Sequence, residues 1–413
     1  MPSCTKRRQS CVQCHYSQHC LQMRTRRFWL GRIEDAWRRR SVLWLSGVRR
    51  AGKTVLAQSL PHTEVLDCER PRVRRLLEDP EGFLAGVADR RVVLDEIHRL
   101  PDPSEVLKVA ADHFPRVRIL ATGSSTLGAS AKFRDTLTGR KTDLWLTPMN
   151  AADLADFGSG TVRRRLRHGG LPPFFLDDDP PENDFQEWMD SYWAKDIQEL
   201  FRIERRASFQ RFTELLLAQS GGMFEASSFA APCGVSRPTI ANYLAILEAT
   251  FVVHVLRPFS THRQSEIVAA PRVYGFDTGF VCYHRGVSEL RNDDLGPLWE
   301  HYVLNEIHGQ LQSRAIRYWR DKRGHEVDFV LARRGRPPIA IECKWSARAA
   351  DLAGLRAFLD RYPGASAFLV AQDVDRSSRR RVGDHEVAVV GLTALIEQLL
   401  ALPPRTLEPT PAR

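Results

Sequence analysis

The sequence has no long apolar run. Its longest ones, such as residues 42–45 and 251–256, fall far short of the roughly 20 residues that a membrane-spanning helix needs. No continuous apolar stretch follows the basic residues near the N-terminus, so we expect no secretory signal. Without such a signal, eight cysteines in 413 residues favour reduced thiols over disulfides. Together these absences predict a cytoplasmic protein that does not enter a membrane.

Lysine is also scarce, because only eight of the 60 Lys and Arg residues are lysine. The chain is 43% hydrophobic and long enough for two to four domains with buried cores, which excludes disorder throughout. Its net charge of +10 suggests an acidic partner such as nucleic acid. However, residues 1–50 hold twelve basic and two acidic side chains, so the remaining residues are neutral as a whole. Contact with DNA must therefore depend on local basic patches or on the arginine-rich segment that precedes residue 47.

From residue 42, short β-rich runs alternate with longer mixed segments, which predicts a parallel α/β sheet with strands at 42–45, 91–94 and 117–121. Loop composition near 169–181 precedes a helix-rich stretch, and strands and helices alternate again from residue 295. The predicted domains are an N-terminal extension (1–29), a nucleotide-binding domain (30–155), a helical and winged-helix region (156–265), a connector (266–294), a second α/β domain (295–402) and a tail (403–413).

The first 22 residues are polar and contain Cys4, Cys11, Cys14, Cys20, His15 and His19. Cys11 and Cys14 have the spacing of one half of a usual zinc site. The candidates for the other half, His19 and Cys20, lie too close together in the sequence to form a knuckle. We expect a disordered extension or an overlong start; a zinc site is the alternative.

Residues 47–54 read Gly-Val-Arg-Arg-Ala-Gly-Lys-Thr and fit the phosphate-binding P-loop, between a predicted strand and a predicted helix. Gly47 and Gly52 allow the backbone N–H groups to approach phosphates closely. Lys53 supplies a compact charge that a guanidinium would not replace, and the Thr54 hydroxyl is a ligand for Mg²⁺. We therefore expect ATP and Mg²⁺ as cofactors.

A second strand, 91–94, ends in Asp95 and Glu96. Asp95 is expected to hold the Mg²⁺ shell and Glu96 to polarise the attacking water. With the P-loop and with residues 119–125, where a strand runs into Thr-Gly-Ser-Ser, this pair resembles an AAA+ type ATPase domain. The resemblance implies a polar residue that senses the γ-phosphate, either Thr122 or Ser124, and an arginine at the phosphates, with Arg140 and Arg134 as candidates.

Further short sequence motifs, taken in their order along the chain, point to a more specific family. These are Arg75, Leu76, Asp79, Pro80, Phe83 and Leu84, then residues 95–101, 122–125, 169–172 and 193–196. They resemble a large, mostly uncharacterised prokaryotic family that joins an AAA+ ATPase to a C-terminal domain of unknown function with a restriction-endonuclease-like fold. The resemblance covers roughly residues 30–395.

Residues 224–248 predict a helix-turn-helix, with Ser236 as the N-cap of the second helix, and residues 251–256 suggest a wing. Such a unit can place its second helix in a major groove. Its exposed positions offer only Arg237, Asn242 and Tyr243 to DNA, whereas phosphate binding normally uses several cations. DNA contact and a packing or lid role both stay open.

Residues 325–344 predict a β-hairpin that places Glu342 and Lys344 on one face, opposite Cys343 and within reach of Asp328. These residues resemble the PD-(D/E)xK nuclease pattern, with Glu300 as an additional acid and Val327 where the pattern often has proline. The resemblance implies that Asp328 and Glu342 hold a divalent metal and that Lys344 orients water. The alternative is a hairpin with a structural ion pair.

Two functions follow from these patterns. The first is a Mg²⁺-dependent AAA+ ATPase with Lys53, Glu96 and Arg140 as catalytic residues, coupled to a nuclease-like and DNA-contacting C-terminal domain. The second is a nucleotide-gated binding switch or regulator whose nuclease-like domain is catalytically inactive. A homo-oligomer or a protein partner is compatible with both.

Overall fold

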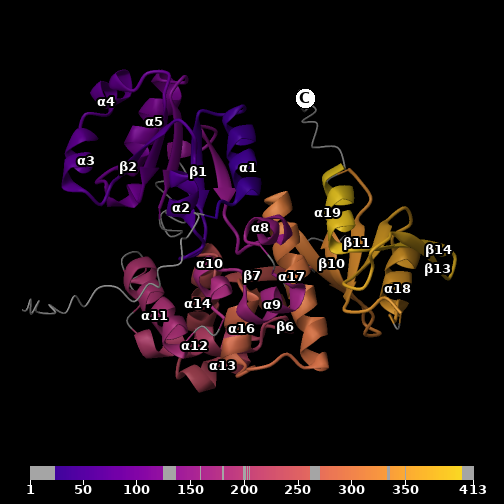
Figure 1. Cartoon of the computed structure of the whole chain (residues 1–413). Coiled ribbons are helices and arrows are strands. Elements are labelled where there is room, and N and C mark those ends of the chain that lie inside the picture. Colours follow the sequence, from indigo (N-terminus) through magenta and orange to yellow (C-terminus); the bar gives the residue numbers. More distant parts are fainter. Residues whose placement is uncertain are drawn as a thin grey trace, which may run out of the picture.

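A computed structural model describes residues 24–123, 136–158, 160–178, 181–198, 201, 203, 205–260, 270–332, 335–348 and 350–401. The cysteine-containing residues 4–20, Ser124 and Arg134 lie outside these ranges. The chain forms an N-terminal α/β domain, a helical region and a C-terminal α/β domain (Figure 1). Among the described residues, no helix is both long and apolar enough to cross a membrane.

The N-terminal domain is built on a five-stranded sheet in the order β2-β3-β4-β1-β5, with every pair parallel. The strands are β1 (Val42–Ser46), β2 (Thr63–Asp67), β3 (Arg91–Asp95), β4 (Arg118–Thr122) and β5 (Lys141–Trp145). The helices are α1 (Arg27–Trp37), α2 (Lys53–Gln58), α3 (Pro71–Leu76), α4 (Pro80–Gly86), the short η1 (Ile97–Arg99) and α5 (Pro103–His113). The predicted strands correspond to β1, β3 and β4.

Alternation along the strands gives this sheet two apolar faces, because successive side chains point to opposite sides. Leu43 and Leu45 of β1 belong to the buried cluster that contains residues of α1 and α2. Val42 and Trp44 belong to a second cluster with residues of α3, α4 and α5. Helices therefore cover both faces, as expected for a parallel sheet.

The helix α1 corrects one predicted boundary. Trp29 and Ile33 are fully buried, so α1 is part of the domain core. The first turn of α1 falls within residues 1–29, the segment predicted to be an extension. The folded domain therefore begins before residue 30.

The helical region begins with α8 (Ala151–Asp156), α9 (Val162–His168), α10 (Pro172–Leu176), α11 (Glu182–Tyr192) and a π-helical turn, η2 (Trp193–Ile197). It continues with α12 (Arg206–Ala218), β6 (Gly222–Met223), α13 (Ala226–Cys233), α14 (Arg237–Ala249), β7 (Val253–Pro258), β8 (Arg272–Gly275) and α16 (Thr278–His284). The strand β8 and helix α16 lie in residues 266–294, which were predicted to be a connector. Phe276 and Phe280 are buried there, so this stretch is part of the fold rather than a linker.

A buried arginine joins α9 to α16. Arg165 is fully buried, and its Nε donates to the Met149 carbonyl oxygen at 2.9 Å while Nη1 donates to Thr278 Oγ1 at 2.9 Å. Asp277 lies 3.8 Å from Nη1 and accepts a hydrogen bond from the Gly170 N–H at 2.6 Å. The buried charge is therefore paired and hydrogen-bonded, as its burial requires.

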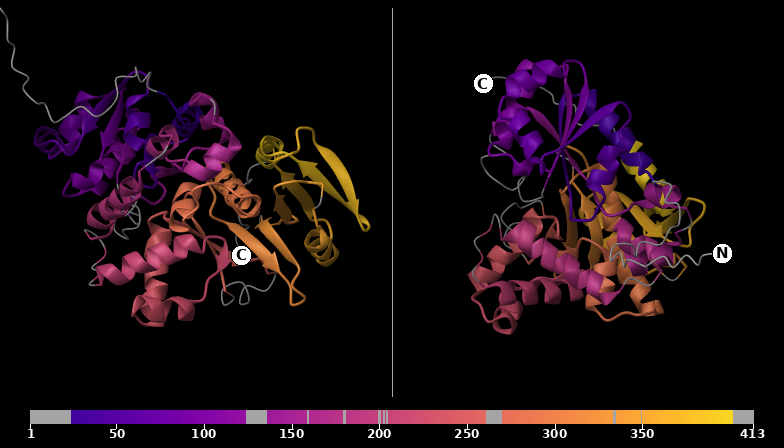
Figure 2. Two further views of the ribbon diagram at one scale, coloured as in Figure 1. Left: turned by 60° about the horizontal axis from the view of Figure 1, so that its bottom comes forward. Right: turned by 60° about the vertical axis from the view of Figure 1, so that its left-hand side comes forward.

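The C-terminal part contains α17 (Asn292–Leu311), β9 (Ile316–Arg320), β10 (Glu326–Leu331), β11 (Ile339–Lys344), α18 (Ala353–Arg361), β12 (Ser366–Ala371), β13 (Ser378–Val382), β14 (His385–Val390) and α19 (Leu392–Ala401). Its strands join those of the helical region in one nine-stranded mixed sheet, ordered β13-β14-β12-β11-β10-β9-β7-β8-β6. The junction is a short parallel pairing of β7 with β9, in which Arg257 is opposite Arg317. The two views of Figure 2 show this part beside the helical region.

Candidate functional site

The loop between β1 and α2 has the geometry that its glycines permit. Gly47 has φ +145°, and a Cβ at this position would collide with the Leu146 carbonyl oxygen. Gly52 is left-handed, with φ +93°, directly before α2. Side chains are therefore strained at both positions. Lys53 Nζ donates to the carbonyl oxygens of Gly47 at 2.9 Å and Val48 at 3.1 Å, which ties the loop into a ring.

Burial lowers the pKa of Lys53, and the negative charges of Asp196 and Glu96 partly oppose this shift. The acidic groups offset only part of the effect of burial, and Arg49 adds to the lowering of the pKa.

Asp95 and Glu96 lie beside Lys53, at the carboxyl end of β3. Asp95 is 6% exposed and accepts a short hydrogen bond from the Thr122 hydroxyl, which in turn accepts one from the Glu96 N–H at 3.2 Å. Burial raises the pKa of Asp95, while hydrogen bonds from Thr122 and Thr54 partly offset the rise. Of the two predicted sensor residues, Thr122 contacts this acidic pair, and Ser124 lies outside the described residues.

Glu96 adopts a left-handed conformation with φ +53°, and its Oε2 lies 3.1 Å from His98 Nδ1. Burial raises the pKa of Glu96, but the hydrogen bond from His98 and the charges of His98, Lys53 and Arg49 outweigh it, so the net pKa is lowered. The carboxylate is therefore ionised and held in place. The motif Asp-Glu-x-His at 95–98 is the sequence signal that could have identified His98.

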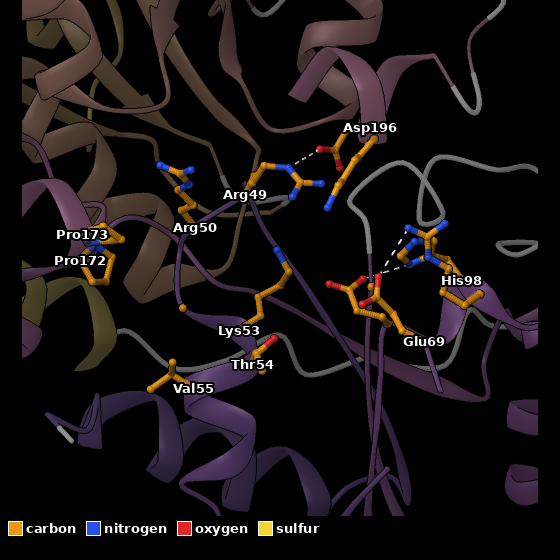
Figure 3. Close-up of a pocket in the computed structure, with 15 residues that line it drawn as sticks. Arg49, Arg50, Lys53, Thr54, Val55, Glu69, His98, Pro172, Pro173 and Asp196 are labelled. Carbon is orange, nitrogen blue, oxygen red and sulfur yellow. Dashed lines mark hydrogen bonds and ion pairs between the residues drawn. The ribbon is translucent and has the colours of Figure 1, made fainter. Parts of the chain in front are cut away.

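One cavity of about 330 Å³, near the lower end of the volumes of small-molecule sites, is lined by Lys53, Thr54, Glu96 and His98 but not by Asp95 or Thr122 (Figure 3). The lining residues are Arg49, Arg50, Gly52, Lys53, Thr54, Val55, Glu69, Glu96, His98, Arg99, Gly123, Pro172, Pro173, Lys195 and Asp196. The last four come from the helical region. Two domains therefore form the cavity, and one of the few lysines, Lys195, stands in its wall.

The helical region also holds the loop directly. Arg49 Nε lies 3.0 Å from Asp196 Oδ2, a pair drawn in Figure 3, and Arg50 Nη2 lies 2.6 Å from Glu187 Oε1. Trp188 Nε1 donates to the Arg49 carbonyl oxygen at 3.0 Å. Asp196 lies in the π-helical turn η2, a type of distortion found frequently at functional sites.

Arg140, predicted as the arginine at the phosphates, lies at the opposite edge of the sheet. It immediately precedes β5, which runs parallel to β1, so it is at the amino end of the strands whereas the P-loop is at the carboxyl end. Its Nε lies 2.8 Å from Asp112 Oδ1. The prediction is therefore wrong for the chain's own cavity, where Arg49, Arg50 and Arg99 are the arginines in the lining.

The residues of α14 offered to DNA are only partly available. Arg237 and Asn242 are exposed, but Tyr243 is 3% exposed and packs edge-on against Phe209. Tyr243 is therefore a core residue and does not face DNA. Arg237 is the one basic residue of this helix.

In the C-terminal domain the four predicted acid and lysine side chains do converge. Lys344 Nζ lies 2.7 Å from Glu342 Oε1, and Asp328 Oδ2 accepts a hydrogen bond from the Cys343 N–H at 2.8 Å. Burial and the charge of Asp328 raise the pKa of Glu342 to about 8 and that of Glu300 to about 7. The three carboxylates thus repel one another in a buried setting.

An arginine that the sequence did not single out enters this cluster. Arg272, on β8, places Nη1 3.5 Å from Glu300 Oε1 and 3.7 Å from Asp328 Oδ1, and Nη2 3.8 Å from Glu326 Oε2. Its guanidinium pairs with Asp328, one of the two carboxylates predicted to hold a metal, while the other, Glu342, pairs with Lys344. Among the described residues, no three His, Cys, Asp or Glu side chains are arranged to hold a metal ion. The predicted metal site at Asp328 and Glu342 stays a prediction, and in this structure Arg272 contacts Asp328 while Lys344 contacts Glu342.

Residues 39–155 match a family described as an AAA domain. Residues 159–291 and 295–394 match two domains of unknown function, DUF8612 and DUF4143. The uncharacterized protein Rv2008c of Mycobacterium tuberculosis is 29% identical over 319 residues, which cover 74% of this chain and 71% of that protein. The uncharacterized protein MJ1544 of Methanocaldococcus jannaschii is 21% identical over 321 residues, covering 69% of this chain and 70% of that protein.

Two solved structures are more distant. The Walker-type ATPase PABY2304 of Pyrococcus abyssi is 14% identical and covers 63% of this chain and 95% of its own, with a TM-score of 0.41. The Bacillus subtilis DNA clamp loader delta protein is 12% identical and covers 67% and 99%, with a TM-score of 0.25.

The contact between Asp196 and Arg49 generates a prediction. Asp196→Asn removes a negative charge next to the cavity and frees Arg49 for an anion, so a triphosphate should bind about 3- to 10-fold more tightly, roughly 1 kcal/mol. Fluorescence titration with a labelled ATP analogue measures this. Glu187→Gln is the matched control: because Glu187 is 63% exposed, its pair with Arg50 is screened by solvent and affinity should change less than about twofold. Unchanged or weaker binding by Asp196→Asn would contradict the prediction.

Proposed function

From the P-loop ATPase domain that residues 39–155 form, we propose that the chain is a Mg²⁺-dependent ATP hydrolase of the AAA+ class. The observation that carries the proposal is that Lys53 and Glu96 line one cavity, and that Thr122 joins Asp95 to Glu96 through hydrogen bonds. Lys53 comes from the phosphate-binding loop, Asp95 and Glu96 from one pair at the end of β3, and Thr122 from the end of β4. A structural role alone does not explain an ammonium beside two acids.

Thr54 and Asp95 are the residues that would hold Mg²⁺, since a hydroxyl and a carboxylate are ligands that this ion accepts. Bound Mg²⁺ would neutralise charge on the phosphate oxygens. The hydrogen bond between these two side chains keeps them together. Thr122 orients the Asp95 carboxylate and, by accepting a hydrogen bond from the Glu96 N–H, fixes the backbone of Glu96.

Glu96 is the base in this mechanism. Its pKa is held down by His98, so it is ionised and accepts a hydrogen bond from the attacking water. Lys53 exchanges its two carbonyl partners for phosphate oxygens. Arg49 and Arg50 lie in the same loop and supply further positive charge; their acidic partners, Asp196 and Glu187, compete with the phosphates for them. Nucleotide binding is thereby coupled to the helical region.

Two substitutions test this assignment. Glu96→Gln should keep ATP binding and lower kcat about 10²- to 10³-fold, because it removes the base alone. Lys53→Ala should weaken ATP binding at least about 10-fold, since it removes a charge-assisted contact with phosphate. Arg140→Ala is the control for binding and should leave the affinity unchanged. Phosphate release and titration with a labelled ATP analogue measure these effects; wild-type protein that neither binds nor hydrolyses ATP contradicts the proposal.

A second proposal concerns the C-terminal domain, and Arg272 is the observation that favours it. With a guanidinium among Glu300, Asp328 and Glu326, the domain serves as a binding module rather than as a metal nuclease. This corresponds to the nucleotide-gated switch. In this view the β8 strand of the helical region controls what the carboxylate cluster can contact.

The nuclease question has a direct test. Duplex and single-stranded DNA are incubated with the full chain and Mg²⁺ or Mn²⁺, with and without ATP. We expect no cleavage, because Arg272 and Lys344 already pair with Asp328 and Glu342, the carboxylates that a nuclease would use to hold its metal. Cleavage that disappears in both Asp328→Ala and Lys344→Ala, while Cys343→Ala retains it, would show an active nuclease.

A further inference from the structure

A second hollow lies in the N-terminal domain, at the edge of the sheet away from the P-loop. Its volume is about 710 Å³. Six arginines line it, and we call it the arginine groove; they are Arg38, Arg39, Arg40, Arg116, Arg118 and Arg140. The ATPase assignment does not use any of them.

The topology explains why these arginines meet. Residues 38–40 precede β1, Arg116 and Arg118 lie before and at the start of β4, and Arg140 precedes β5. These three strands are parallel neighbours in the order β4-β1-β5, so their amino ends share one edge. Neighbouring strands are about 4.8 Å apart, so the backbones of three strands span on the order of 10 Å. The arginine side chains extend this strip further.

The groove has more positive than negative charge. Its two acidic residues are Asp89 and Asp112, and they pair with Arg116 at 3.1 Å and Arg140 at 2.8 Å. Within the described part of the chain, neither Arg39 nor Arg118 has a carboxylate partner. Four of the six arginines are largely exposed: Arg38, Arg39, Arg40 and Arg116.

The excess is local, because residues 51–413 are neutral as a whole. Residues 38–40 belong to the segment that holds the net charge of the chain. Their place in the groove makes it a local basic patch of the kind that contact with DNA requires.

We propose that the arginine groove binds the sugar-phosphate backbone of double-stranded nucleic acid without sequence preference. Forked guanidinium groups match phosphate oxygens, and duplex DNA presents one charge per about 1.7 Å of its axis. The only aromatic residue among those lining the groove in the described structure is Trp37, which is 3% exposed. Stacking on unpaired bases is therefore weak here, which favours a duplex over a single strand.

The position of the groove has a functional meaning. It lies at the amino ends of the strands, whereas the ATP cavity lies at their carboxyl ends. The sheet can therefore carry nucleotide and nucleic acid at the same time. This inference does not depend on ATP hydrolysis, because the groove shares no lining residue with the cavity.

The test uses the full chain and a labelled 30-base-pair duplex of random sequence, without nucleotide. Fluorescence anisotropy is followed across salt concentrations. Arg39→Gln/Arg118→Gln removes two cations that have no acidic partner and keeps most of each side-chain stem. The slope of log K against log salt should become shallower by about 2, and affinity near 0.1 M salt should fall about 10- to 100-fold.

The control is Arg379→Gln/Arg381→Gln, on β13, which removes two exposed arginines at the far edge of the other sheet. It should leave the slope unchanged. Equal thermal midpoints and equal ATP binding for both double variants show that the fold is kept. Retention of the wild-type slope by Arg39→Gln/Arg118→Gln overturns the proposal, as does an equal loss in the control.

Two further probes identify the partner class. A single strand of the same sequence should bind more weakly than the duplex, and polyglutamate should bind at least about 10-fold more weakly. Groove-dependent binding of polyglutamate without binding of the duplex would assign the groove to an acidic protein and reject a nucleic-acid partner. Tighter groove-dependent binding of the single strand would reject the duplex.

Discussion

The phosphate loop is held from outside its own domain, and this contact organises the candidate active site. The ion pair between Arg49 and Asp196 fixes a side chain of the loop, and the hydrogen bond from Trp188 to the Arg49 carbonyl oxygen fixes its backbone. Both partners belong to α11 and the π-helical turn that follows it. A change in the loop therefore reaches the helical region without an intermediate, because Asp196 and Trp188 contact Arg49 directly.

Arginine and lysine have separate duties in this chain. The deeply placed ion pairs, such as Arg165 with Asp277 and Arg272 with Glu300, use guanidinium groups, whose fixed fork makes several bonds at once. Three of the scarce lysines, Lys53, Lys195 and Lys344, stand at the nucleotide cavity or in the carboxylate cluster. An ammonium on a flexible stem can leave one partner for another, which suits a site whose contents change.

Much of the nucleotide site could be predicted from the sequence because its chemistry lies in short motifs next to strand ends. Lys53, Asp95 and Glu96 needed only local spacing. The prediction that Arg140 lies at the phosphates was wrong, because the sequence alone does not show at which end of the sheet a loop lies. The parallel topology decides that. The strands β2 and β5 were missed because they are mixed in polarity, as in Lys-Thr-Asp-Leu-Trp, and alternate poorly. Arg272 had no local signal, since it meets Asp328 only through the pairing of β8, β7, β9 and β10.

The nine-stranded sheet has a consequence for how the chain can be divided. Along the sequence, β7 and β9 belong to different matched segments, yet in space they are neighbouring strands of one sheet. A cut between these segments would give each fragment an exposed edge strand. The N–H and C=O groups of that strand would have lost their partners, and such an edge can pair with another copy of the fragment. The helical region and the C-terminal strands therefore form one folding unit. The boundary between the two matched sequence families lies inside this unit.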